Sequence, residues 1–196
     1  MAAVPRGVEP DPRLAVGTHP QVYGPGEDSR LLLRAVEVRP GERVLEVGTG
    51  TGYVALHAAK VATVVATDVS PHAVALARRN ALANRLPLAV VRADGLRGLR
   101  GPFDAIAMNP PYLIEAVGGD WSARAWQGGV AGDDLILRFL GEAPGRLARG
   151  GRMYVIVPAN RDRALAAARA SFSVRVAAEL PLFFEKLLAL ELTDPR

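Results

Sequence analysis

The sequence of 196 residues contains no cysteine, so the chain itself can form neither a disulfide nor a cysteine-based zinc site. It has only three histidines, His19, His57 and His72, and they lack the spacing of metal ligands. We therefore interpret them as ordinary surface or core residues and predict no metal site. A G-x-S-x-G motif and a paired-carboxylate pattern are also missing, which argues against the hydrolases that depend on them.

Long apolar runs are missing as well, which predicts no membrane-spanning segment. Residues 1–20 are interrupted by Pro5, Pro10 and Pro12 and have no apolar core, so we expect a flexible N-terminal arm there and no signal peptide. Because 49% of the chain is hydrophobic, residues 21–196 suffice for a single domain with a sizeable core. Together these features predict a cytoplasmic protein.

Lysine is scarce, with two lysines beside 22 arginines, and the net charge is +4. A basic chain fits a nucleic-acid partner. The arginines, however, are spread along the chain and never form a run of four. We interpret most of them as solvent-exposed, so nucleic acid is an alternative partner that the charge pattern does not favour.

Apolar strand-like runs alternate with helical segments, which predicts an α/β fold whose mainly parallel sheet has helices on both faces. The last two strands are joined by a link too short for a helical crossover, so they should pair antiparallel. The predicted strands are 43–48, 62–67, 88–93, 103–108, 151–157, 173–180 and 187–193. The predicted helices are 27–38, 53–60, 71–84, 132–147 and 160–170.

The stretch Asn109-Pro110-Pro111-Tyr112 follows a predicted strand directly, so it should lie at a carboxyl strand end, where open α/β sheets bind ligands. The prolines have no N–H and leave carbonyl acceptors, Asn109 adds an acceptor oxygen, and Tyr112 adds an apolar wall. Acceptors beside an aromatic plane suit a planar –NH2 group, because they bind both hydrogens and leave the lone pair directed at an electrophile. The motif is therefore typical of methyl transfer to an amide or exocyclic amine, and its alternative reading is a rigid turn.

A second motif lies in residues 43–53, where a predicted strand runs into a glycine-rich turn and then a helix. Gly48, Gly50 and Gly52 permit positive φ and a close approach of backbone to ligand. The loosened G-x-G-x-x-A pattern also fits a dinucleotide fold. Glu46 argues against that fold, because an acid before the first glycine would face a pyrophosphate badly but would suit the amino group of a methionine-type ligand.

Acids also end the next two predicted strands. Asp68 stands twenty residues after Gly48, where an acid binds ribose hydroxyls in both nicotinamide and S-adenosylmethionine enzymes. Asp94 ends the third strand, where a carboxylate can meet an adenine amino group. Either acid alone fits a solvated loop. As a series of strand ends with Glu46 and Asn109, they indicate one ligand site.

The two motifs together resemble those of the class I methyltransferases that use S-adenosylmethionine. The chain is further similar to the HemK-type protein glutamine methyltransferases, in the short archaeal and eukaryotic form that lacks the N-terminal helical domain. This narrower resemblance rests on residues 22–33, which match a Tyr-x-Pro-Ala-Glu-Asp-Thr/Ser segment, and on residues 126–132, which match a Trp-x-Gly-Gly-x-x-Gly loop. The chain departs at Gly26, where alanine is usual, and at Gly95, where a bulkier residue is usual and glycine would loosen the adenine pocket.

The resemblance implies a Rossmann-like sheet of seven strands in the order 3-2-1-4-5-7-6, with the last strand antiparallel, and S-adenosylmethionine as cofactor. The cofactor-binding residues that it implies are Ser29, Glu46, Gly48, Gly50, Gly52, Asp68, Asp94, Gly95 and Asn109. The catalytic residues that it implies are Asn109, Pro110 and Tyr112, and Pro111 joins these three in binding the substrate.

As methyl acceptor, the resemblance favours the glutamine of the Gly-Gly-Gln motif in a class I translation termination factor. Adenine N6 in DNA or RNA and a protein lysine are alternatives from the same chemistry. A non-catalytic cofactor-binding scaffold is a further alternative, but it would predict a damaged motif, whereas every motif position is intact.

The third predicted strand, in particular Leu88-Ala89-Val90-Val91-Arg92, is apolar on both faces, and the resembled topology places it at one edge of the sheet. Native proteins usually cover such an edge, because an exposed apolar strand promotes aggregation. In the resembled enzymes a small zinc-binding activator protein pairs with this edge. We therefore expect either such a partner here or cover by a neighbouring loop or by residues 1–20.

Overall fold

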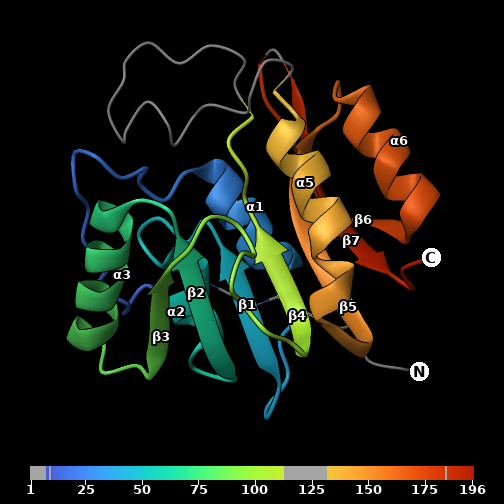
Figure 1. Cartoon of the computed structure of the whole chain (residues 1–196). Coiled ribbons are helices and arrows are strands. Elements are labelled where there is room, and N and C mark those ends of the chain that lie inside the picture. The colour runs from blue at the N-terminus through green and yellow to red at the C-terminus, as the bar shows by residue number, and fades with distance from the viewer. Residues whose placement is uncertain (1–7, 9, 113–131, 184) are drawn as a thin grey trace, which may run out of the picture.

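The computed structural model describes residues 8, 10–112, 132–183 and 185–196. Its strands form a seven-stranded sheet in the order β3-β2-β1-β4-β5-β7-β6, as predicted (Figure 1). The strands are β1 (Arg43–Val47), β2 (Thr63–Asp68), β3 (Leu88–Arg92), β4 (Phe103–Met108), β5 (Leu147–Pro158), β6 (Ser173–Pro181) and β7 (Lys186–Thr193). The helices are α1 (Glu27–Ala35), α2 (Tyr53–Ala58), α3 (Pro71–Ala83), α5 (Asp134–Glu142) and α6 (Asp162–Ser171), with a 3-10 turn at Pro144–Arg146.

Strands β1 to β5 pair in parallel, whereas β7 runs antiparallel to both of its neighbours, β5 and β6. The crossovers from β1 to β2, from β2 to β3 and from β4 to β5 carry helices, and residues 93–102 lead from β3 to β4 through turns alone. Strands β6 and β7 are joined by a short hairpin. This connection pattern is the physical reason for the mixed sheet, because a hairpin cannot return the chain in the parallel direction. The predicted α/β class is confirmed.

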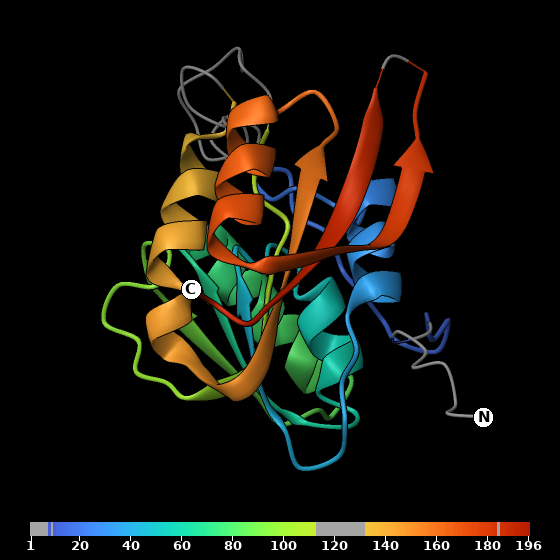
Figure 2. The same cartoon turned by 90° about the vertical axis from the view of Figure 1, so that its right-hand side faces the viewer.

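Two hydrophobic clusters cover the two faces of the sheet. Helices α1, α2 and α3 pack on one face, and α5 and α6 pack on the other, so the sheet forms the middle layer (Figure 2). Successive residues of β1 and β4 belong to opposite clusters: Val44 and Ala105 face α1 to α3, while Leu45 and Ile106 face α5 and α6. This alternation follows from the two-residue period of a strand whose faces are both buried.

The helices near 53–60 and 71–84 end one or two residues earlier than predicted, and two others differ more. The first ends at Ala35 rather than near residue 38, because Val36 is already extended and the β-branched side chains of Val36 and Val38 favour that conformation. The segment predicted as one helix over 132–147 is helical from Asp134 to Glu142 and then tightens into a 3-10 turn at Pro144. Proline has no N–H for a further helical bond, so the chain leaves the helix there and enters β5.

The described part of the predicted N-terminal arm is attached to the domain by hydrogen bonds. Asn84, the C-cap residue of α3, exchanges two bonds of 2.8 Å with the backbone of Ala15. Asn80, one turn earlier, exchanges two of 3.1 Å with Gly17. His57 of α2 accepts another arm N–H through Nε2 at 2.9 Å. These contacts show where the described part of the arm lies, and both its predicted flexibility and the domain boundary at residue 20 stay predictions.

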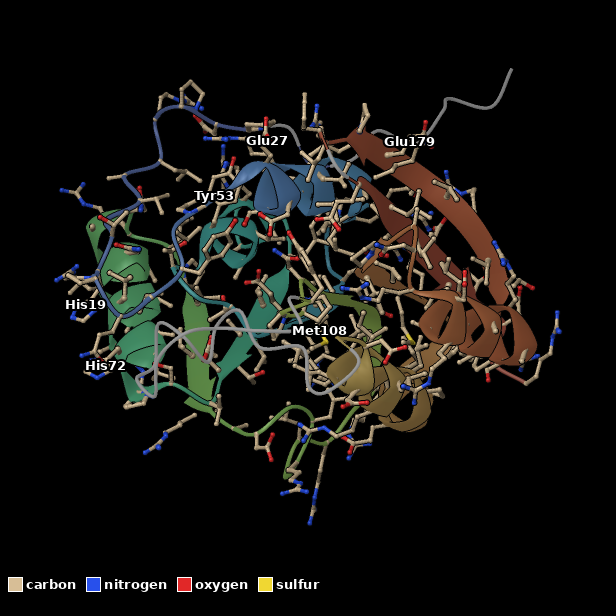
Figure 3. All side chains as sticks on the ribbon, turned by 90° about the horizontal axis from the view of Figure 1, so that it is seen from above. His19, Glu27, Tyr53, His72, Met108 and Glu179 are labelled. Atoms are coloured by element: carbon tan, nitrogen blue, oxygen red, sulfur yellow. The ribbon has the colours of Figure 1, made fainter. Side chains whose placement is uncertain are left out.

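After these contacts the arm crosses α3 towards the carboxyl ends of the strands. His19 and His72 stack there with ring centroids 5.2 Å apart (Figure 3). Val22 then packs against Ala73 and Leu76. The arm thereby leads residues 21–25 to the functional site.

Strand β3 is an edge strand, as predicted. It is not equally apolar on its two faces: Val90 is 6% exposed and belongs to the core, whereas Val91 is 40% exposed. The carbonyl of Val90 accepts two bonds, of 2.7 and 3.2 Å, from the guanidinium of Arg78 on α3. In the described part of the chain, no helix is both long and apolar enough to cross a bilayer.

Candidate active site

A cavity of about 220 Å³ opens at the carboxyl ends of β1, β2, β3 and β4. The register aligns these ends, since Val47 pairs with both Thr67 and Met108, and Asp68 pairs with Arg92. Met108, at the end of β4, lies near the middle of the view onto this edge (Figure 3). Eight of the nine predicted cofactor residues line the cavity, and seven of them are Ser29, Glu46, Gly48, Gly50, Asp68, Asp94 and Asn109. The eighth is Gly95.

Glu46 is a buried carboxylate at the end of β1, with 5% of the residue exposed. Its Oε2 accepts the backbone N–H of Ala55 at 3.0 Å and a short bond from the Thr49 hydroxyl. Burial raises the pKa of Glu46 to about 7, although both hydrogen bonds act in the opposite direction. Because both bonds go to Oε2, Oε1 is the oxygen available to a cationic ligand group.

Asp68, at the end of β2, is held by two backbone donors. The N–H of Gly50 binds Oδ2 and the N–H of Ser70 binds Oδ1, each at 2.9 Å. Burial raises the pKa of Asp68, and these N–H groups partly offset that shift. Ser70 also caps α3 by accepting the N–H of Ala73, with Pro71 at the first helical position. The carboxylate is thus fixed between the glycine-rich turn and the start of α3.

The glycines of the turn have different surroundings. At Gly48, with φ +72°, a Cβ would meet no atom within 4 Å, so a side chain there would project into open space at the cavity. At Gly52, with φ +84°, a Cβ would lie 3.3 Å from the Cβ of Ala77. Gly52 does not line the cavity, so in this structure it serves the close packing of α2 against α3.

Asp94, after β3, is paired with two arginines. Arg138 of α5 donates to Oδ1 at 2.5 Å, and Arg97 lies 3.1 Å from Oδ2. The hydrogen bond from Arg138 lowers the pKa of Asp94. A Cβ at Gly95 would overlap Nη2 of Arg138, so the space beside this glycine is filled by the guanidinium.

The predicted acceptor motif is organised by Asp28, a buried residue in the first turn of α1. Asn109 donates from Nδ2 to Asp28 Oδ2 at 3.0 Å, and the Tyr112 hydroxyl lies 3.5 Å from the same oxygen. Asp28 Oδ1 accepts the Tyr23 hydroxyl at 2.9 Å and the N–H of Ser29 at 2.6 Å. Because an ionised carboxylate can only accept, it fixes which end of the Asn109 amide points away.

That other end, Asn109 Oδ1, is buried and has no hydrogen-bond partner among the described residues. A buried carbonyl oxygen without a donor is unusual and calls for a functional explanation. The remaining motif residues lie close by: Pro111 lines the cavity, Pro110 is buried, and the carbonyl of Tyr112 accepts Arg161 at 2.8 Å. Burial and the nearby Asp28 carboxylate raise the pKa of the Tyr112 hydroxyl, so it stays protonated.

Several site residues were not singled out from the sequence. Asp28 and its neighbour Glu27 resemble the acids that commonly begin a helix, and Arg138 is one of many dispersed arginines. Tyr23 and Leu135 line the cavity too. Tyr23 and Asp28 belong to the segment 22–33 that supported the resemblance, but the sequence assigned neither a role in the site, and Leu135 carries no local signal. Of the segment 126–132 that supported the resemblance, residues 126–131 lie outside the described residues. In the described part of the chain, no group of three or more His, Asp or Glu side chains could hold a metal ion.

A sheet of this order, with a glycine-rich turn after β1 and acids at three neighbouring strand ends, defines a class I methyltransferase fold. The model of the methyltransferase small domain family matches residues 13–179. The chain therefore belongs to this family, and its relatives confirm the HemK-type grouping that its motifs indicate.

Three comparisons are informative. A protein of Methanocaldococcus jannaschii, named provisionally as a protein N5-glutamine methyltransferase, is 32% identical over 88% of this chain and 91% of its own length. The release factor glutamine methyltransferase of Deinococcus radiodurans is 41% identical over 69% of this chain, which spans about half of that enzyme (51%). A chain of the E. cuniculi Mtq2–Trm112 complex, described as responsible for methylation of the termination factor eRF1, superimposes with a TM-score of 0.70 at 26% identity, covering 88% of this chain and 98% of that one.

Proposed function

We propose that this chain transfers a methyl group from S-adenosylmethionine to the side-chain amide of a protein glutamine. The donor chemistry belongs to the cofactor, whose sulfonium carries an activated methyl group. The chain's own residues bind it and orient the acceptor. The observation that carries the proposal is the buried oxygen of Asn109 that lacks a donor beside the cofactor cavity.

The cavity residues fit this cofactor. Glu46 Oε1 is available to the amino group of the methionine moiety, and the open space at Gly48 leaves room for its carboxylate end. Asp68, fixed by two N–H groups, has further lone pairs for ribose hydroxyls. Asp94 and Gly95 stand at the adenine end. Ser29, on the N-terminal side of the cavity, supports the methionine end.

The acceptor end fits a primary amide. Such an amide has two N–H donors and a nitrogen lone pair that is delocalised and therefore weakly nucleophilic. Asn109 Oδ1 accepts one N–H and the carbonyl of Pro110 accepts the other, while Tyr112 packs against the amide plane. These acceptors raise the electron density on nitrogen and hold it in line with the methyl carbon. The N-methylated amide cation is strongly acidic, so its proton leaves to water without a dedicated base.

As substrate we propose the glutamine of the Gly-Gly-Gln motif in a class I translation termination factor. The names of the Deinococcus enzyme and of the E. cuniculi complex support this choice. Termination factors act on ribosomes, so we also propose that the chain works in the cytoplasm. The alternatives that share the motif are an adenine N6 amine and a protein lysine.

The decisive experiment compares Asn109→Ala with the wild type. The chain is incubated with methyl-labelled S-adenosylmethionine and, separately, with termination factor, a Gly-Gly-Gln to Gly-Gly-Ala variant of that factor, histone-type lysine peptides, and total tRNA or DNA. We expect label on the intact termination factor alone. Asn109→Ala should lower that transfer by on the order of 100-fold or more while cofactor binding stays within a few-fold.

Asn160→Ala is the matched control, because it removes the same side chain from an exposed position that does not line the cavity. It should keep normal turnover. Label on nucleic acid or lysine would assign the alternative acceptor, and cofactor binding without any transfer would favour a scaffold. Normal turnover by Asn109→Ala would contradict the mechanism.

We further propose that a small partner, of the zinc-binding activator type that the resemblance implies, pairs with β3. An edge strand with an exposed Val91 suits strand addition, and the Mtq2–Trm112 complex supports the idea. Val91→Lys is the appropriate probe, since Val90 belongs to the core and its replacement would unfold the chain. A purified Trm112-type protein should stimulate turnover of the wild type and of Leu82→Lys, an exposed site on α3, but not of Val91→Lys. Full activity of the chain alone, unchanged by that protein, would contradict the proposal.

A further inference from the structure

The side chain of Arg138 joins two parts of the site that are 44 residues apart in sequence. It extends from α5 and donates to Asp94, which follows β3 at the edge of the cavity. Its Nε also lies 3.9 Å from Glu142, one turn further along α5. Both Arg138 and Asp94 line the cavity. The guanidinium is therefore held between two carboxylates at the wall of the site.

Gly95 is the reason that the guanidinium can occupy this place. Its φ of +59° favours glycine, and any Cβ there would overlap Nη2 of Arg138. The guanidinium of Arg138, from α5, thus fills the space that a side chain at residue 95 would occupy. The adenine end is closed by this arginine rather than loosened by the glycine.

The pair also decides what Asp94 can offer a ligand. Asp94 is 44% exposed at its side chain, so without a partner it would rotate freely in solvent. Arg138 binds Oδ1 and Arg97 lies beside Oδ2, and each oxygen keeps a further lone pair that can accept a donor from a ligand in the cavity. An oriented, ionised carboxylate accepts an N–H donor but repels a carbonyl oxygen.

We infer that Arg138 is a positioning residue that makes the cofactor pocket selective for a 6-amino purine, acting through Asp94. The inference rests on the proposed cofactor. A purine with an amino group at C6 donates to the oriented carboxylate. A 6-oxo purine presents a carbonyl there and is rejected.

The test measures the affinities of S-adenosylhomocysteine and of its deaminated form, S-inosylhomocysteine, by calorimetry. Arg138→Met keeps the length of the side chain and removes the guanidinium. We expect this variant to bind S-adenosylhomocysteine more weakly, on the order of tenfold, and to change the affinity for S-inosylhomocysteine by less than about threefold. The reason is that an aligned charge-assisted hydrogen bond is lost only for S-adenosylhomocysteine. The ratio of the two dissociation constants is the readout, since a general loss of packing would weaken both ligands equally.

Arg97→Met is the matched control: Arg97 pairs with the same carboxylate but does not line the cavity. It should leave both affinities within about twofold, since its side chain is 71% exposed and such pairs contribute little. In an Asp94→Ala background, Arg138→Met should have no further effect on the ratio.

An unchanged ratio in Arg138→Met, or an equal loss in the Asp94→Ala background, would overturn the inference. Failure of the wild type to bind S-adenosylhomocysteine at all would instead overturn the proposed cofactor. Urea denaturation of each variant identifies any variant that is unfolded. If Arg138→Met is unfolded, Arg138→Leu provides the same comparison, because leucine also has no donor for Asp94, and an unchanged ratio in that variant would overturn the inference as well.

Discussion

The buried carboxylate of Glu46 gives a quantitative prediction about both stability and binding. Its carboxyl group has an ordinary pKa of 4.5, which burial raises to about 7 in the folded chain. Glu46→Gln keeps the shape of the side chain and an oxygen that can accept from Thr49 and Ala55, but it removes the charge. The variant therefore separates the cost of a buried charge from the value of that charge to a cationic ligand.

The sign of the pH effect follows from the direction of the shift. Since the folded-state pKa lies above the unfolded one, the fold favours the protonated carboxyl group. Its contribution to stability is fully present below about pH 4.5 and is lost as the pH rises through about 7. The full difference corresponds to about 3 kcal/mol, of which about 2 kcal/mol falls between pH 5.5 and 8.5.

Urea denaturation at these two pH values measures this contribution. The difference in unfolding free energy between wild type and Glu46→Gln should shift by about 2 kcal/mol, with the variant gaining relative stability at pH 8.5. Glu179→Gln, the same change on an exposed part of β6, should show no such shift (Figure 3). Glu46→Gln should also bind S-adenosylmethionine roughly ten- to a hundredfold more weakly. A pH-independent difference, or unchanged cofactor affinity, would refute the assignment of a ligand-binding charge to Glu46.

Three further predictions concern other parts of the chain. Asp28→Asn should lower the rate of methyl transfer on the order of 100-fold, because an amide at residue 28 no longer fixes the orientation of the Asn109 side chain. The affinity for the cofactor should stay within a few-fold, and equal losses in turnover and in cofactor binding would contradict this prediction. Asp68→Ala should weaken the binding of S-adenosylmethionine, measured by calorimetry, by roughly 1.5–3 kcal/mol and should not create affinity for NADH. Tight binding of NADH by the wild type would contradict the assignment of S-adenosylmethionine as cofactor. Arg152→Met should lower the free energy of unfolding, measured by urea denaturation, by about 3 kcal/mol, because it leaves the poorly exposed carboxylate of Glu42 without its partner. A decrease below about 1 kcal/mol would show that water solvates the Glu42 carboxylate in place of Arg152.

The fold followed closely from the sequence because its signals are local and repeated. Each strand is a short apolar run, and each helix has its own period and, as at Ser70-Pro71, its own start signal. The ends of two helices were predicted too late, although local residues, the extended Val36 and Pro144, decide them. Contacts from a distant segment, in contrast, have no local signal. The N-terminal arm contains several prolines and lacks an apolar core, yet Asn80 and Asn84, more than sixty positions away, bind its backbone. No local sequence pattern in the arm predicts these hydrogen-bond partners.

The site was predictable to the extent that strand ends define it. In a parallel sheet the carboxyl ends meet at one edge, so Glu46, Asp68, Asp94 and Asn109 could be grouped without coordinates. Side chains that reach this edge from helices could not be grouped in the same way. Asp28 lies 81 positions from Asn109, and only the packing of α1 against the sheet brings the two together.

Through Asp28, the N-terminal end of α1 contributes both to the cofactor cavity and to the acceptor motif of the proposed reaction. The residues just before α1 line the cofactor cavity, and the first turn of α1 supplies the carboxylate that holds Asn109 and Tyr112. A shift of the arm would therefore move a wall of the cofactor cavity and the acceptor motif together. Hydrogen bonds to α2 and α3 restrain the arm against such a shift. Since methyl transfer depends on alignment more than on acid–base catalysis, this restraint sets the geometry before the acceptor arrives, so little reorganisation is left for the reaction itself.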